Sequence, residues 1–164
     1  MITVIYAMFL FPGLIMAVIG IEVFQIPAWK VMMWFSIAIA GGLIVFKILF
    51  FGFRYQTGFP LGDILPTVIY QVFVITYAEE SFFRGFMLEI GKGHAGIGIL
   101  ASAVLFSIFH LAAYSSQGLN FAAFGVAFVM GLAFGFVYIA TRHFAGIGVV
   151  WGMHAGWNLV LLLG

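Results

Sequence analysis

Long apolar runs, separated by short polar breaks or breaks containing glycine and proline, fill almost the whole chain. Each run is close to the roughly 20 residues that a helix needs to cross the hydrocarbon core of a bilayer. The runs lack the apolar–polar alternation of transmembrane β-strands. The pattern therefore predicts membrane-spanning helices at residues 2–23, 29–52, 62–90, 96–113, 120–141 and 146–163.

The third of these predicted helices, at residues 62–90, is long for one span, and its second half is polar. We expect it to bend or to leave the bilayer near Glu79. Pro60 and Pro66 mark its start, because proline is favoured in the first turn of a helix.

Glycines recur at a spacing of four residues in the last two predicted helices. Small residues at this spacing let two helix backbones approach closely inside a membrane. We therefore expect them to pack helices against one another. The glycines concerned are Gly131 with Gly135, and Gly148 with Gly152 and Gly156.

Composition supports the membrane interpretation, with 65% hydrophobic residues, 7% charged residues and a mean hydropathy of +1.25. Soluble globular domains lie far from these values. We expect an all-α, polytopic membrane helical bundle of about six transmembrane helices, forming one integral membrane domain over residues 1–164 with its motif-bearing core at about 62–163. Residues 1–20 lack the basic start and cleavage site of a signal peptide, so we expect a retained span.

Charge and cysteine content exclude several kinds of function. The formal net charge is +1, and the six Lys and Arg residues are scattered, so no basic patch for nucleic acid is expected. The chain has no cysteine, which excludes disulfides, thiol nucleophiles and thiolate metal sites. We expect a multi-pass protein of a prokaryotic cell membrane, the prokaryotic origin being suggested by the compactness of the chain.

Glu79, Glu80 and Arg84 place three ionisable groups in an otherwise apolar chain. Such a group at bilayer depth is disfavoured by roughly 2.5–3.5 kcal/mol, so it persists where it pairs, faces a wet cavity or takes part in chemistry. Glu80 and Arg84 are four residues apart, which favours an ion pair within one helix. Glu79 points about 100° away from Glu80, which leaves it available for another role.

Two later predicted helices carry polar pairs at the same spacing. Phe106 and His110 lie four residues apart on one helix, and His154 and Asn158 lie four residues apart on the last. If the three helices are neighbours, Glu79, His110, His154 and Asn158 converge on one cavity. A carboxylate and an imidazole can then activate a water, while a second imidazole and a carboxamide donate hydrogen bonds to an oxyanion.

Other protease chemistries find less support in the sequence. Asp63 is the only aspartate, so an aspartyl pair is impossible. The zinc-protease string H-E-x-x-H is absent, and none of the six serines lies in a G-x-S-x-G turn. His94 and His143 fall in predicted loops, and we leave them out of the site.

Three motifs in order resemble those of the CAAX protease and bacteriocin-processing family, also called CPBP or Abi. The family motifs are E-E-x-x-x-R, F-x-x-x-H and H-x-x-x-N. Here they correspond to Glu79-Glu80-Ser81-Phe82-Phe83-Arg84, Phe106-Ser107-Ile108-Phe109-His110 and His154-Ala155-Gly156-Trp157-Asn158. The resemblance implies a helical membrane bundle and an intramembrane glutamic endopeptidase that needs no cofactor.

The resemblance also implies roles for individual residues. Glu79 with His110 would activate water, and His154 with Asn158 would form the oxyanion hole. Glu80, Arg84 and Phe106 would support these groups. The implied partners are the lipid bilayer and a peptide or protein substrate, which can carry a prenyl group.

Two alternatives remain open from the sequence. Glu79, His110 and His154 could form a metal-binding set of two histidines and one carboxylate, giving a metal-dependent protease. The same cavity could instead hold a peptide without cleaving it, as in a binding or immunity protein.

Overall fold

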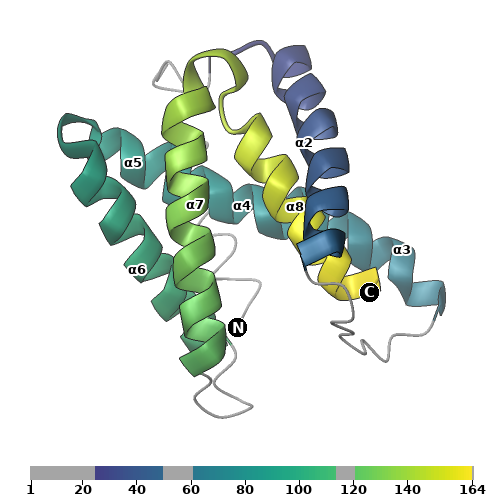
Figure 1. Cartoon of the computed structure of the whole chain (residues 1–164). Coiled ribbons are helices and arrows are strands. Elements are labelled where there is room, and N and C mark those ends of the chain that lie inside the picture. Colours follow the sequence, from purple (N-terminus) through teal and green to yellow (C-terminus); the bar gives the residue numbers. More distant parts are fainter. Residues whose placement is uncertain (1–24, 50–60, 114–120, 164) are drawn as a thin grey trace.

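The computed structural model describes residues 25–49, 61–113 and 121–163, and almost all of these residues are helical (Figure 1). No strand occurs in these three ranges, which confirms the all-α prediction. The predicted helix at 2–23 lies outside them. The elements are α2 (Ala28–Leu49), α3 (Leu61–Ile69), η2 (Tyr70–Ile75), α4 (Thr76–Glu80), η3 (Ser81–Phe86), α5 (Met87–Ile90), η4 (Lys92–His94), α6 (Ala95–Ala113), α7 (Phe121–Ala145) and α8 (Gly148–Leu163).

Within the described ranges, α2 and α7 are long and apolar enough to cross a membrane, and Ala95–Leu111 and Gly148–Leu162 are shorter apolar helices. Large apolar side chains are exposed on the outer faces of the bundle, among them Ile48 on α2, Ile97 on α6 and Val129 on α7. Such surfaces suit lipid better than water. The fold is therefore that of a helical membrane protein.

The helices form two closely packed pairs that a third, segmented element connects. α2 packs along α8, and α6 packs along α7. The segmented element from α3 to α5 passes behind α7 and α8 in Figure 1. Its central segment α4 contacts α8, and η3 and α5 contact α6. This arrangement brings the helices that carry the three sequence motifs together.

Glycines make both helix pairs possible, as predicted. A Cβ atom at Gly148 would lie 2.5 Å from the carbonyl oxygen of Val31 in α2, and one at Gly152 would lie 2.5 Å from that of Phe35. In the other pair, a Cβ at Gly131 would lie 3.0 Å from Cα of Ala103 in α6. The backbones therefore touch directly, which is the close approach expected of small residues in membrane helices.

The last turn of α7 extends beyond the predicted end at residue 141. The helix continues to Ala145, and Arg142 in its last turn bonds the carboxylate of Glu89 at 2.6 Å. A basic residue is favourable at a helix C-terminus, and this pair also ties α7 to α5. Gly146 then ends the helix with a positive φ of 56°, a conformation that glycine adopts without strain.

The predicted helix at 62–90 is interrupted in a way that the sequence did not indicate. It consists of three α-helical segments separated by two π-helical segments, η2 and η3, which flank α4. Pro66 lies inside α3 instead of in its first turn. Glu79 and Glu80 occupy the end of α4, between the two π-helical segments.

Candidate active site

Glu80 and Arg84 form a fully buried ion pair. The Arg84 NH1 group donates to Oε1 of Glu80 at 2.9 Å, and both side chains have no exposed surface. The NH2 group of Arg84 also lies 3.5 Å from the carbonyl oxygen of Gly131 in α7. The ion pair predicted from the four-residue spacing is confirmed, and it additionally links the segmented element to α7.

His154 of α8 lies between the two glutamates. Its Nδ1 atom is 2.7 Å from Oε1 of Glu80, and its Nε2 atom is 3.5 Å from Oε2 of Glu79. All three side chains are buried. The sequence left open whether these helices are neighbours, and it did not predict that Glu80 bonds Arg84 and His154 with the same oxygen.

His110 of α6 approaches the same cluster from another side. Its Nδ1 atom is 2.9 Å from the carbonyl oxygen of Phe106, one turn earlier. The ring of His110 lies against that of Phe106, which also lies close to the ring of His154. With Nδ1 donating to the backbone, Nε2 is the nitrogen that can accept a proton or a hydrogen bond.

The ring of Phe106 lies close to three polar groups of the site, those of His110, His154 and Arg84. The ring centroid lies 4.2 Å from that of His110 and 5.7 Å from that of His154. The guanidinium carbon of Arg84 lies 4.6 Å from the same ring, a cation–π distance. Phe106 is buried, so it excludes water from the side of the cluster that it covers.

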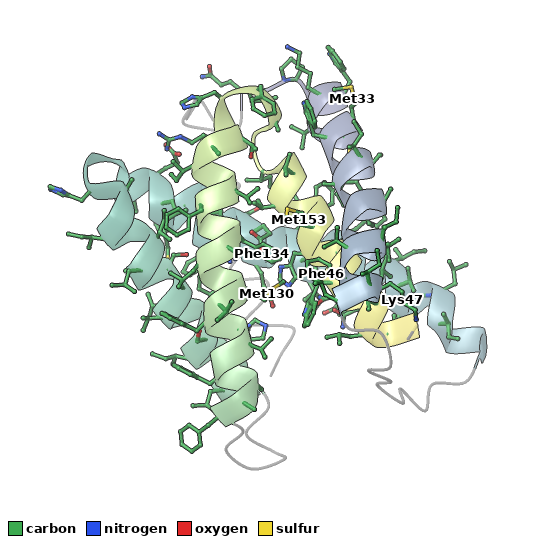
Figure 2. The ribbon with its side chains drawn as sticks, viewed as in Figure 1. Met33, Phe46, Lys47, Met130, Phe134 and Met153 are labelled. Atoms are coloured by element: carbon green, nitrogen blue, oxygen red, sulfur yellow. The ribbon has the colours of Figure 1, made fainter. Side chains whose placement is uncertain are left out.

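Phe134 of α7 is a neighbour that the sequence reasoning missed. Its ring lies 5.5 Å from the ring of His154 and 5.5 Å from the guanidinium carbon of Arg84. Figure 2 shows Phe134 with Met130 and Met153 in the region between α7 and α8, where they belong to one apolar cluster. An apolar residue in an apolar helix gives no sequence signal of such a position.

The remaining candidate residues are placed as follows. Asn158 lies one turn after His154 on α8 and is half buried. His94 and His143 are exposed, and His143 belongs to the last turn of α7 and not to a loop. Within the described ranges, no group of three or more His, Cys, Asp or Glu side chains is arranged to hold a metal ion.

The arrangement offers a set of groups suited to proton transfer in a buried site. Two carboxylates and two imidazoles come from three separate helical elements, and an arginine fixes one carboxylate. Charged and polar groups fixed in a low-dielectric interior act more strongly than in water, and they need little reorganisation during a reaction. Such a site can activate a water molecule and stabilise negative charge on a substrate oxygen.

A comparison with protein families supports this chemistry. The family model described as "Type II CAAX prenyl endopeptidase Rce1-like" matches residues 61–160, which include every site residue discussed above. The chain belongs to the Rce1-like family. Comparisons with curated proteins and with solved structures gave no match.

Membership of the Rce1-like family gives the chain a general class of activity. The family is one of CAAX-type endopeptidases that act in membranes on prenylated proteins. The Rce1-like match begins at α3 and ends within α8, so it covers the segmented element, α6, α7 and most of α8. Helix α2 lies before the matched residues.

Proposed function

We propose that this multi-pass membrane protein is a glutamic endopeptidase that hydrolyses the peptide bond of a prenylated CAAX-type substrate within the bilayer. The observation that carries the proposal is the position of His154, whose ring contacts both glutamates of the E-E-x-x-x-R motif. The family match supports the substrate class.

In the proposed mechanism, Glu79 is the general base. Glu80 is held by Arg84 and His154, so of the two carboxylates Glu79 is the one that can change protonation without breaking the buried ion pair. His110 would act through Nε2, because its Nδ1 is directed at the Phe106 carbonyl. Glu79 and His110 together would orient a water, and Glu79 would take its proton as the oxygen attacks the scissile carbonyl carbon.

His154 and Asn158 would stabilise the resulting oxyanion. In the doubly protonated imidazole, Nδ1–H donates to Glu80 while Nε2–H can donate to the substrate oxygen. Asn158 would add an amide N–H from one turn further along α8. Collapse of the tetrahedral intermediate then breaks the C–N bond, and Glu79 returns its proton to the leaving amine.

The decisive experiment compares two acid-to-amide variants of the segmented element. Purified Glu79→Gln in lipid nanodiscs should lose cleavage of a farnesylated CAAX peptide by about 10²–10⁴-fold, because a carboxamide cannot accept the proton. Glu89→Gln is the matched control, because Glu89 bonds Arg142 and Tyr138 outside the site. It should retain activity within about threefold.

A peptide of the same sequence without the farnesyl group tests the substrate class, and we expect it to be cleaved much more slowly. Full activity of a correctly folded Glu79→Gln variant would refute the assigned base. If no CAAX peptide is cleaved but Glu79→Gln still binds one, a non-catalytic peptide-binding role would replace the proposal.

A further inference from the structure

Each of the two π-helical segments beside α4 ends with a backbone hydrogen bond that runs five residues back. At the end of η2, the Thr76 N–H group bonds the carbonyl of Gln71, five residues back, where a regular α-helix would use Val72. At the end of η3, the Met87 N–H group bonds Phe82 and not Phe83. The carbonyls of Val72 and Phe83 therefore do not receive the N–H donor that an α-helix assigns to them.

The Val72 carbonyl accepts a hydrogen bond from another helix. The indole Nε1–H of Trp151 in α8 donates to it at 2.7 Å, across 79 residues of sequence. The hydroxyl of Thr76 donates to the same oxygen at 2.6 Å from within its own helix. Trp151 is buried and packs against Phe35, with ring centroids 4.1 Å apart.

The Phe83 carbonyl is bonded in the same way from the opposite side. The hydroxyl of Ser102 in α6 donates to it at 2.9 Å. Ser102 has no exposed surface, so this bond is shielded from competing donors. The carbonyls of Val72 and Phe83 are thus each the acceptor for a side chain of a neighbouring helix.

Both donors lie on helices that carry a histidine of the site. Trp151 precedes His154 by three residues, which is less than one turn of α8, and Ser102 precedes His110 by about two turns of α6. The acceptors lie on either side of Glu79 and Glu80 in the segmented element. One hydrogen bond therefore fixes each histidine helix against the helix of the glutamates.

We propose that Trp151 and Ser102 are positioning residues, which set the register of His154 and His110 relative to the glutamates through the carbonyls that the π-helical segments expose. The effect on activity rests on the proposed function of the same site. π-Helical turns occur frequently at functional sites, and this arrangement gives the two turns here a physical role. A misplacement of about 1 Å can lower a rate by about 10²-fold, so the register of these helices matters.

The test removes each donor and compares it with a matched variant. Trp151→Phe keeps an aromatic ring but loses the N–H group, and Trp34→Phe makes the same change on α2, where the ring packs on Phe144. Ser102→Ala removes the hydroxyl that reaches the segmented element. Ser107→Ala is its control, because the buried Ser107 hydroxyl bonds Ala103 of its own helix.

We expect Trp151→Phe and Ser102→Ala to lower kcat for the prenylated peptide by about 10-fold while KM changes less than about twofold, and we expect both controls to stay near wild type. The second readout is the ¹⁵N NMR spectrum of the imidazole nitrogens in histidine-labelled protein. Trp151→Phe should shift the His154 signals and leave those of His110, and Ser102→Ala should do the reverse. With four histidines in the chain, single substitutions assign each signal.

Unchanged kcat and unchanged histidine signals in both folded variants would overturn the proposal. Equal loss of thermal stability in a variant and its control, with unshifted histidine signals, would show a packing role only and would also overturn it. The NMR readout needs no substrate. The NMR readout therefore tests the positioning role even if the protein proves to have no peptidase activity.

Discussion

Glu80 bonds His154 at 2.7 Å with the same oxygen that accepts a hydrogen bond from Arg84. This shared oxygen makes the second glutamate of the E-E-x-x-x-R motif the centre of the buried network. The first glutamate, Glu79, lies 3.5 Å from the other nitrogen of the same ring. The two adjacent carboxylates therefore differ in environment, which is how similar groups come to have different roles in one site.

Removing Arg84 should destabilise the protein strongly. Arg84→Met leaves Glu80 buried without its guanidinium, and removing one partner of a buried ion pair lowers the free energy of unfolding by about 3–5 kcal/mol. Unfolding in mixed micelles with increasing dodecyl sulfate measures the change. Arg142→Met is the control, because that pair is partly exposed and Glu89 keeps the Tyr138 hydroxyl at 3.1 Å. Equal losses for the two variants would contradict the central role of Arg84.

Filling the contact between α2 and α8 should also destabilise the protein. A Cβ at Gly152 would lie 2.5 Å from the Phe35 carbonyl oxygen and 2.8 Å from Cβ of Ala38. Gly152→Ala should therefore lower the free energy of unfolding by about 1–3 kcal/mol, the range for overpacking. A Cβ at Gly41, on α2, would meet nothing within 4 Å. Gly41→Ala should be neutral or slightly stabilising, and a destabilisation as large as that of Gly152→Ala would contradict the assigned contact.

Asn158 should affect catalysis more than binding. If its amide donates to the oxyanion, Asn158→Ala should lower kcat by about 10²–10³-fold with little change in KM. Asn158→Asp has nearly the same shape but replaces a donor by an acceptor, so we expect it to be no more active than Asn158→Ala. Steady-state kinetics on the prenylated peptide measures both. An active aspartate variant would show that Asn158 serves only to fill space.

Chelators separate the glutamic mechanism from the metal-dependent alternative. The proposed steps use a carboxylate, imidazoles and an amide, so prolonged treatment with EDTA or phenanthroline should leave the rate unchanged. Loss of activity that added Zn²⁺ restores would favour a metal held by Glu79, His110 and His154. Elemental analysis of the active protein provides the independent measurement.

The sequence predicted the class of fold and the buried pair of Glu80 and Arg84 for identifiable physical reasons. Charged groups in apolar helices must find partners, so the pairing of Glu80 with Arg84 followed from the four-residue spacing. The packing role of Gly148 and Gly152 followed from the membrane preference for small residues. These inferences depend on local spacing and on strong energetic constraints, which a single sequence displays directly.

Other features depend on contacts between distant residues, and the sequence could not display them. At the two π-helical segments, the carbonyls of Val72 and Phe83 accept hydrogen bonds from Trp151 and Ser102, which belong to other helices. Nothing in the sequence of an apolar segment shows which backbone carbonyl will accept a hydrogen bond from another helix. The bond between His154 and Glu80 likewise depends on the register of α8 against α4, which is set by tertiary packing. Phe134 of α7 lies against His154 and Arg84, but an apolar residue in an apolar helix gives no sequence signal of this position.

The contact of α2 with α8 has a consequence for how relatives of this protein can be recombined. α2 lies before the residues matched by the family model, yet its main chain supports the helix that carries His154. A chimera that joins the segment from residue 61 onward to an unrelated leading helix would inherit the full set of reactive groups. The chimera would fold correctly only if the main chain of the new helix could approach α8 as closely as that of α2 does. Compatibility between the two parts therefore depends on the steric fit at Gly148 and Gly152 and not on the three sequence motifs.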